Sequence, residues 1–237
     1  MTPGRYSAEG IVSAALLALM MRRSLVLPNE KAIRPVSLHK VFNAGLGRRM
    51  GLAWVLAVLK LGTYWTCYTW LPSFLLKEMG QSIGKSMSWI LTAQVGQFVG
   101  MLTFGTLADK WGRRPAYSVY SVLTAGALAT LAFGWSWLNV HLGWFWLTML
   151  LLGFGSGCTA GFGALLAELF PTGVRATAQG LCYNAGRALS ALAPFTLGVV
   201  ADRRGIGVAL ALTAGFYILG AALMLLLPET RAREVQG

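Results

Sequence analysis

Residues 105–114 of this chain read Gly-Thr-Leu-Ala-Asp-Lys-Trp-Gly-Arg-Arg, a G-x-x-x-D-[RK]-x-G-R-[RK] pattern directly after a long apolar stretch. One interpretation is local: a turn glycine followed by arginines that anchor the end of a membrane helix. The other is that the whole pattern acts as one functional unit. The surrounding sequence decides between them.

The rest of the chain is too apolar for a soluble domain. Hydrophobic residues make up 56% and charged residues 12% of the sequence, and the mean hydropathy is +0.60. The net charge of +12 does not indicate nucleic acid, because the basic residues are spread between apolar blocks. The three cysteines lie in apolar stretches without metal-ligand spacing, so we expect no metal and no cofactor.

Six apolar blocks are each long enough to cross a bilayer as a helix. They cover about residues 51–76, 88–108, 116–137, 144–169, 176–201 and 206–227. Backbone groups in lipid must be hydrogen-bonded within their own segment, which favours helices. The sequence therefore predicts an all-α membrane protein. Its parts are an amino-terminal segment and linker (1–47), a bundle of six transmembrane helices (48–228) and a tail (229–237).

The basic residues are divided unequally between the two sides of this bundle. Cytoplasmic loops carry an excess of Lys and Arg, which here predicts a multi-pass protein of the plasma membrane, a bacterial inner membrane, with both termini in the cytoplasm. The thirteen residues on the predicted cytoplasmic side are Arg22, Arg23, Lys31, Arg34, Lys40, Arg48, Arg49, Lys110, Arg113, Arg114, Arg175, Arg231 and Arg233; the four on the other side are Lys77, Lys85, Arg203 and Arg204.

Two further stretches follow apolar blocks in the same way. Residues 168–175 read Glu-Leu-Phe-Pro-Thr-Gly-Val-Arg, and residues 228–231 read Pro-Glu-Thr-Arg. Together with residues 105–114 they resemble the signature elements of the major facilitator superfamily, the last one in its sugar-porter and organic-acid-symporter branches. The resemblance covers residues 48–235. The order of the motifs resembles their order along helices seven to twelve of the family, the carboxy-terminal half of that fold. Lys110, Pro115 and Ala232 depart from the residues that are commonest in the family motifs.

The resemblance implies a gate that holds the cytoplasmic side shut. Gly105 would let another helix approach closely. Asp109 could face the positive end of the helix that begins near Thr172, and Arg113 or Arg114 could pair with Glu168. The predicted gating residues are Gly105, Asp109, Lys110, Gly112, Arg113, Arg114, Glu168, Pro171 and Arg175.

Glycine patterns add two expectations about helix packing. Residues 198–203 echo residues 105–110 at the opposite end of the fifth block, which suggests a three-plus-three inverted repeat. Gly153, Gly157 and Gly161 recur every four residues in the fourth block, and this spacing predicts close helix packing and not a nucleotide-binding loop.

Two basic residues lie within the predicted spans, Lys60 in the first and Arg187 in the fifth. A charge in a membrane interior is a functional candidate by default. The alternatives are that Arg187 braces carbonyls or the gate carboxylates, and that Lys60 extends to an interface. The functional hypothesis makes Arg187 a clamp for an anionic substrate. The other lining candidates are Lys60, Tyr64, Trp65, Tyr68, Gln94, Gln97, Tyr183 and Asn184.

The predicted function is half of a secondary transporter for a small solute that works by alternating access. An organic anion is favoured over a sugar, because the paired glutamines typical of sugar porters are absent from residues 51–76. All eight carboxylates lie outside the middle of the spans, so proton coupling would come from a missing amino-terminal half, encoded separately or lost by truncation.

Besides a sugar-transporter half, two alternatives to that hypothesis stay open. The chain could associate with itself, or it could be a truncated or regulatory membrane protein without transport activity of its own. A membrane enzyme is disfavoured, because His39 and His141 have no carboxylate nearby in the sequence.

Overall fold

Helices make up almost all of the described chain. The computed structural model describes residues 46–77, 80 and 82–230. The helices are α3 (Gly47–Lys77), α4 (Ile83–Trp111), α5 (Arg113–Val140), α6 (Leu142–Ser156), α7 (Thr159–Glu168), α8 (Arg175–Ser190), α9 (Ala193–Arg204) and α10 (Ile206–Leu226). No strand occurs in this part of the chain, so the prediction of an all-α fold is confirmed. The predicted amino-terminal segment, apart from residues 46 and 47, and the tail beyond Thr230 lie outside the described residues.

The first three spans are longer than the apolar blocks that predicted them. Helices α3, α4 and α5 have 31, 29 and 28 residues, which gives each a length of about 42 Å or more. The hydrocarbon core of a bilayer is only about 30 Å thick. The polar helix ends therefore reach beyond the core, and the arginines that open α5 belong to a helix and not to a loop.

The fourth and fifth apolar blocks are each divided into two helices. The fourth breaks at Gly157 and Cys158, between α6 and α7, and the fifth breaks between Ser190 and Ala193. Pro194 lies in the first turn of α9, where its missing N–H leaves no hydrogen bond unmade. Within a continuous helix the same proline would clash with the preceding turn, which explains why α8 and α9 are separate. Among the described residues, five stretches are long and apolar enough to cross a membrane, judged by length and composition, and α6 with α7 forms one of them. The α8–α9 pair is not among them.

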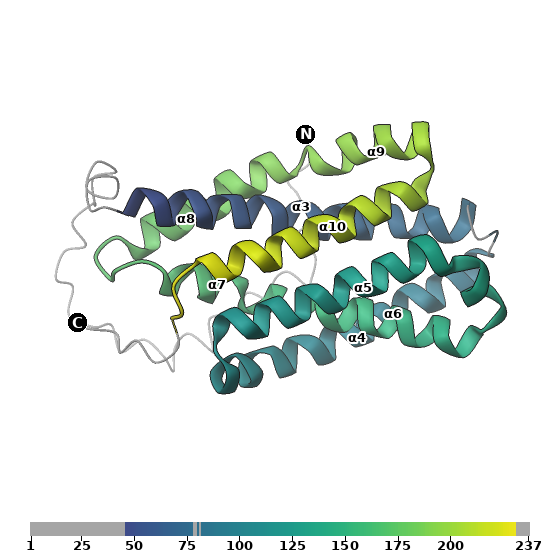
Figure 1. Ribbon diagram of the computed structural model, residues 1–237, viewed down its shortest axis with the longest axis horizontal. Coiled ribbons are helices and arrows are strands. Elements are labelled where there is room, and N and C mark those ends of the chain that lie inside the picture. The colour runs from purple at the N-terminus through teal and green to yellow at the C-terminus, as the bar shows by residue number, and fades with distance from the viewer. Residues whose placement is uncertain (1–45, 78–79, 81, 231–237) are drawn as a thin grey trace, which may run out of the picture. The chain divides into compact units, whose positions relative to one another are not determined.

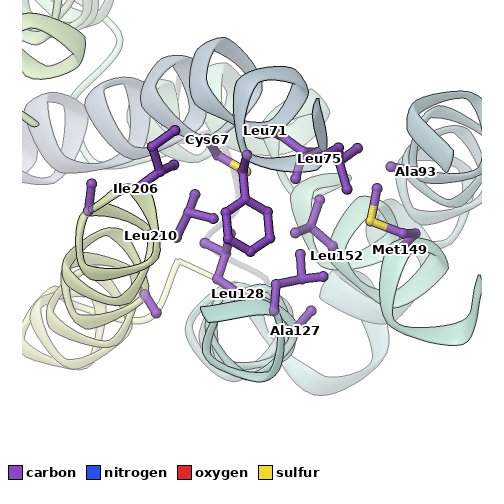
Figure 2. Close-up of a cluster of buried hydrophobic side chains, with 14 of the residues drawn as sticks. Cys67, Leu71, Leu75, Ala93, Ala127, Leu128, Met149, Leu152, Ile206 and Leu210 are labelled. Carbon is purple, nitrogen blue, oxygen red and sulfur yellow. The ribbon is translucent and has the colours of Figure 1, made fainter. Parts of the chain in front are cut away.

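The helices pack around two groups of buried apolar side chains. Helix α5 lies against α6 and α10, α4 lies against α6, and α3 lies against α8 and α10. Figure 2 shows one group, in which Leu71, Leu128, Leu152 and Leu210 extend from four different helices toward a common centre. The second group surrounds Tyr117, Tyr120 and Phe162.

The predicted glycine packing is confirmed, because the fourth span lies directly on α4. A Cβ atom on Gly153 would come within 1.8 Å of the Ala93 carbonyl oxygen, and one on Gly157 within 2.4 Å of the Gly100 carbonyl carbon. A Cβ atom on Gly161 would come within 2.2 Å of the Phe104 ring. The glycines therefore bring two backbones into contact, as small residues do between membrane helices.

Three helix connections consist of one residue each: Gly112, His141 and Gly205. Gly112 and Gly205 have φ values of 103° and 90°, a region that favours glycine. The α4–α5 connection, the α7–α8 connection and the end of α10 lie at the same end of the bundle (Figure 1). We call this the motif end, because it holds residues 109–114.

Candidate functional site

A cluster of charged residues joins three helix ends at the motif end. Asp109 lies near the end of α4, Arg113 opens α5, and Glu168 is the last residue of α7. Residues 228–230 follow α10 and reach the same place. The short connection at Gly112 keeps Asp109 and Arg113 together, and the ten-residue α7 brings Glu168, 55 positions from Arg113, within hydrogen-bond distance of it.

The Arg113 guanidinium binds two carboxylates. Its Nε lies 3.1 Å from Glu168 Oε2 and its Nη2 lies 3.0 Å from Glu168 Oε1, a two-pronged arrangement that suits the planar guanidinium. Its Nη1 contacts Asp109, four residues earlier. The side chains of Arg113, Glu168 and Asp109 are 24%, 31% and 68% exposed, so water screens these pairs to different degrees.

Arg114 has a different set of contacts, although it is the neighbouring arginine. Its Nη2 donates to the carbonyl oxygen of Leu225, near the end of α10. Of the two arginines that could pair with Glu168, the structure therefore selects Arg113. Arg114 ties α5 to the last helix instead.

Glu229 and Thr230 complete the cluster, and the sequence-based hypothesis did not include them. Glu229 Oε1 accepts the backbone N–H of Arg113 at 2.8 Å, and Oε2 accepts that of Arg114 at 3.2 Å. This carboxylate therefore caps the start of α5, where helix N–H groups are unpaired and the helix dipole is positive. Thr230 Oγ1 donates to Glu168 Oε2 at 2.7 Å. The Pro-Glu-Thr stretch at residues 228–230 marks the family in the sequence, but the sequence does not indicate that Glu229 and Thr230 join the charge cluster.

Gly112 is required here for two reasons. Its φ of 103° is unfavourable for other residues, and an added Cβ would lie 2.9 Å from Glu229 Oε2. The second glycine of the motif is therefore part of the site. Gly105, by contrast, is exposed and no other part of the described chain comes within 4 Å of where its Cβ would be.

The remaining predicted gating residues lie at the edge of the cluster. Lys110 and Pro171 are exposed. Arg175 is half-buried, and its Nε donates to the Phe170 carbonyl oxygen at 3.3 Å. Arg175 therefore stabilises the turn between α7 and α8.

Four of the predicted lining residues of the first two spans meet in one group: Tyr64, Trp65, Tyr68 and Gln97. Gln97 Nε2 of α4 donates to the Tyr64 hydroxyl of α3 at 3.2 Å. The Tyr64 ring lies 4.8 Å from that of Tyr68 and 5.8 Å from that of Trp65, measured between centroids. Gln97 is buried whereas Gln94 is exposed, so the two glutamines do not act as a pair.

The predicted lining residues of α8 are more open. Arg187 and Asn184 are both exposed, and Asn184 Nδ2 donates to the Gly180 carbonyl oxygen at 2.8 Å. Tyr183 is half-buried and packs on Phe162 of α7. The described contacts do not join Arg187 to the Tyr64 group, so Arg187 is an exposed cation in the last turn of α8.

Lys60 is placed differently from both sequence-based expectations. Its side chain is only 1% exposed, so it neither extends to an interface nor shares the exposed position of Arg187. Its Nζ lies 3.1 Å from Cys158 Sγ, between the rings of Tyr117 and Tyr217. This side of α3 faces the interior of the bundle.

Comparisons with known proteins agree with this architecture. Residues 53–237 match the family model described as Major Facilitator Superfamily. The chain is 29% identical over 222 residues to the cis,cis-muconate transport protein of Acinetobacter baylyi, which covers 91% of this chain and 51% of that protein. It is 31% identical over 241 residues to a Cupriavidus pinatubonensis protein named "Probable 4-methylmuconolactone transporter", which covers 97% of this chain and 54% of that protein.

A crystal structure of a double-tryptophan variant of XylE has the same fold, with a TM-score of 0.60 at 16% identity over 81% of this chain and 48% of that one. The chain thus spans about half the length of the relatives it matches. Its helices correspond to one half of their fold. The family model covers most of the chain, and the chain belongs to the major facilitator superfamily.

Proposed function

We propose that this chain is the carboxy-terminal half of a secondary transporter that moves a small organic anion by alternating access. The observation that carries the proposal is the charge cluster at the motif end, in which Arg113 binds Glu168 and Asp109 while Glu229 caps α5. The cluster ties together helix ends that must separate if a passage is to open between them.

The strength of the cluster suits a gate. Its pairs are partly exposed, so each is worth only about 1 kcal/mol. Several such pairs together hold a closed state, yet none presents a barrier that substrate binding could not overcome. The excess of basic residues supports placing the motif end and both termini on the cytoplasmic side of a plasma membrane.

The exposed cation of α8 supports an anionic substrate. Arg187 and Asn184 lie on one helix and lack apolar cover within the described chain. Charged residues within membrane spans mark substrate pathways. The named cargo of one relative, cis,cis-muconate, is a dicarboxylate, which agrees with an arginine clamp. The aromatic group of Tyr64, Trp65 and Tyr68 suits a flat, unsaturated acid.

A second six-helix half would complete the transporter. It would cover the exposed polar residues of α8 and α4 and build a cavity at the interface between the halves. In the described residues no carboxylate is buried, so the second half is also the proposed source of the proton-coupling acid.

Complementation tests the proposal. This chain is expressed with the amino-terminal half of the cis,cis-muconate transport protein, and uptake of labelled muconate into proteoliposomes is measured. We expect uptake with both halves and none with either half alone. Uptake by this chain alone would indicate a self-associated transporter. Absence of uptake, despite co-purification of the two halves, would favour a membrane protein without transport activity.

A further inference from the structure

We propose that Lys60 is a positioning residue: it holds the break in the fourth span and thereby places Glu168 in the charge cluster. The inference starts from the interior of the bundle, where Lys60 is the one charged side chain among the buried residues of the described chain. Burial of a charge in a membrane protein is costly and calls for a specific reason.

The Lys60 ammonium connects four of the spans. It extends from α3 and donates to Cys158, which lies in the break between α6 and α7, at 3.1 Å. Its Nζ lies 5.9 Å from the centroid of the Tyr117 ring of α5 and 5.5 Å from that of the Tyr217 ring of α10. Aromatic faces attract cations at this range. The charge is thus held by a thiol and two rings, with no buried carboxylate among the described residues.

The two parts of the fourth span are held in different ways. Helix α6 is fixed on α4 by backbone contact at Gly96, Gly153 and Gly157. Helix α7 makes fewer close contacts of this kind and carries Glu168 as its last residue. Its Phe162, Leu165 and Leu166 side chains are buried in the second apolar group. The break sets the angle at which α7 leaves α6, so a residue that holds the break also helps to place Glu168.

The Lys60 side chain is placed to hold the break between α6 and α7, because its Nζ donates to Cys158 within that break. Cys158 precedes Glu168 by ten residues, about 15 Å of helix, so a small change of angle at Cys158 displaces the Glu168 carboxylate. The hydrogen bonds from Arg113 to Glu168, at 3.0 and 3.1 Å, tolerate little displacement. The membrane interior and the charge cluster are thereby linked through α7.

Amide hydrogen exchange of the whole chain in lipid nanodiscs tests the inference. Lys60→Met leaves an unbranched side chain that is one atom shorter and uncharged, and Cys158→Ala removes the acceptor. We expect each to speed exchange of residues 159–168 by about tenfold. The double variant should show no further increase, because both changes break the same contact. Cys158→Ser should keep the wild-type rate, because a hydroxyl also accepts from an ammonium.

Two controls separate positioning from general stability. Cys182→Ala makes the same change at another buried cysteine, whose Sγ lies 3.7 Å from the Met50 carbonyl oxygen, and should leave exchange of α7 unchanged. Lys60→Met should not lower the temperature of global unfolding, because it removes a buried charge. The inference would be overturned if amide exchange of α7 were unchanged in Lys60→Met and Cys158→Ala. It would also be overturned if the two effects added in the double variant, or if exchange became faster in all helices alike.

The consequence for gating rests on the proposed function, and a separate measurement tests it. In the two-half transporter, Lys60→Met should lower the maximal uptake rate at least several-fold and leave the KM for muconate unchanged, because the cluster and not the cavity is disturbed. An unchanged uptake rate would overturn the link to the gate. If no uptake occurs in the wild type, the proposed function fails, and the exchange experiment still decides the role of Lys60.

Discussion

The side chains of two neighbouring arginines in this chain have different partners, and only Arg113 pairs with carboxylates of the charge cluster. Arg113 binds Glu168 and Asp109, whereas Arg114 donates to a backbone carbonyl of α10. Successive residues of a helix point about 100° apart, so identical side chains meet different neighbours.

Arg113→Ala should therefore abolish uptake by the two-half transporter while the protein still inserts in the membrane. The change leaves Glu168 and Asp109 without their shared cation and opens the motif end. Uptake of labelled muconate and the amount of protein in the membrane fraction measure the two effects. Arg114→Ala is the matched control and should retain more uptake. Normal uptake by Arg113→Ala would contradict the gating role.

Arg187→Gln should weaken binding of an anionic substrate by about tenfold or more, since a hydrogen bond to a charged group is worth about 1.5–3 kcal/mol. Competition by unlabelled muconate measures the affinity. Arg203→Gln removes an exposed cation at the end of α9 and should leave affinity unchanged. Equal affinity in wild type and Arg187→Gln would exclude the clamp.

At the scale of helices, glycines decide how closely α4 and the fourth span approach. Gly153→Ala should destabilise the chain by at least about 1–3 kcal/mol, because the added methyl group would overlap the Ala93 carbonyl oxygen. Thermal unfolding in detergent measures the effect. Gly126→Ala is the control: it meets no atom within 4 Å and should be neutral or stabilising. Similar melting of both variants would contradict the packing.

The start of α5 depends on a residue that follows α10. Glu229→Ala should cost about 1 kcal/mol, the usual worth of a helix cap, and should speed amide exchange at residues 113–116. Hydrogen exchange by mass spectrometry resolves this segment from the rest of α5. Asp202→Ala, at the exposed end of α9, should leave that segment unchanged. Exchange at residues 113–116 that is the same with and without Glu229 would rule out the cap.

At the scale of the whole molecule, the charge distribution predicts the orientation in the membrane. A green fluorescent protein fused after Gly237 should fluoresce, because it folds in the cytoplasm, and an alkaline phosphatase fused there should be inactive. The two reporters give opposite signals for each orientation, so an active phosphatase would overturn the placement of the termini.

The sequence by itself determined the class of fold, the approximate position of five of the six predicted spans and the packing role of the glycines. These depend on hydrophobicity and on backbone hydrogen bonds within each segment, which are local along the chain. The motif at residues 105–114 likewise identified the charge cluster, but not the arginine that pairs or the carboxylate that caps α5.

Only the tertiary structure decided the choice of Arg113 over Arg114, the cap by Glu229 and the burial of Lys60. Each depends on how helices are rotated against one another, and the contacts join residues 55, 116 and 98 positions apart. Local periodicity places a side chain on a face of its own helix. It carries no information about which distant helix meets that face, so these pairings follow from packing alone.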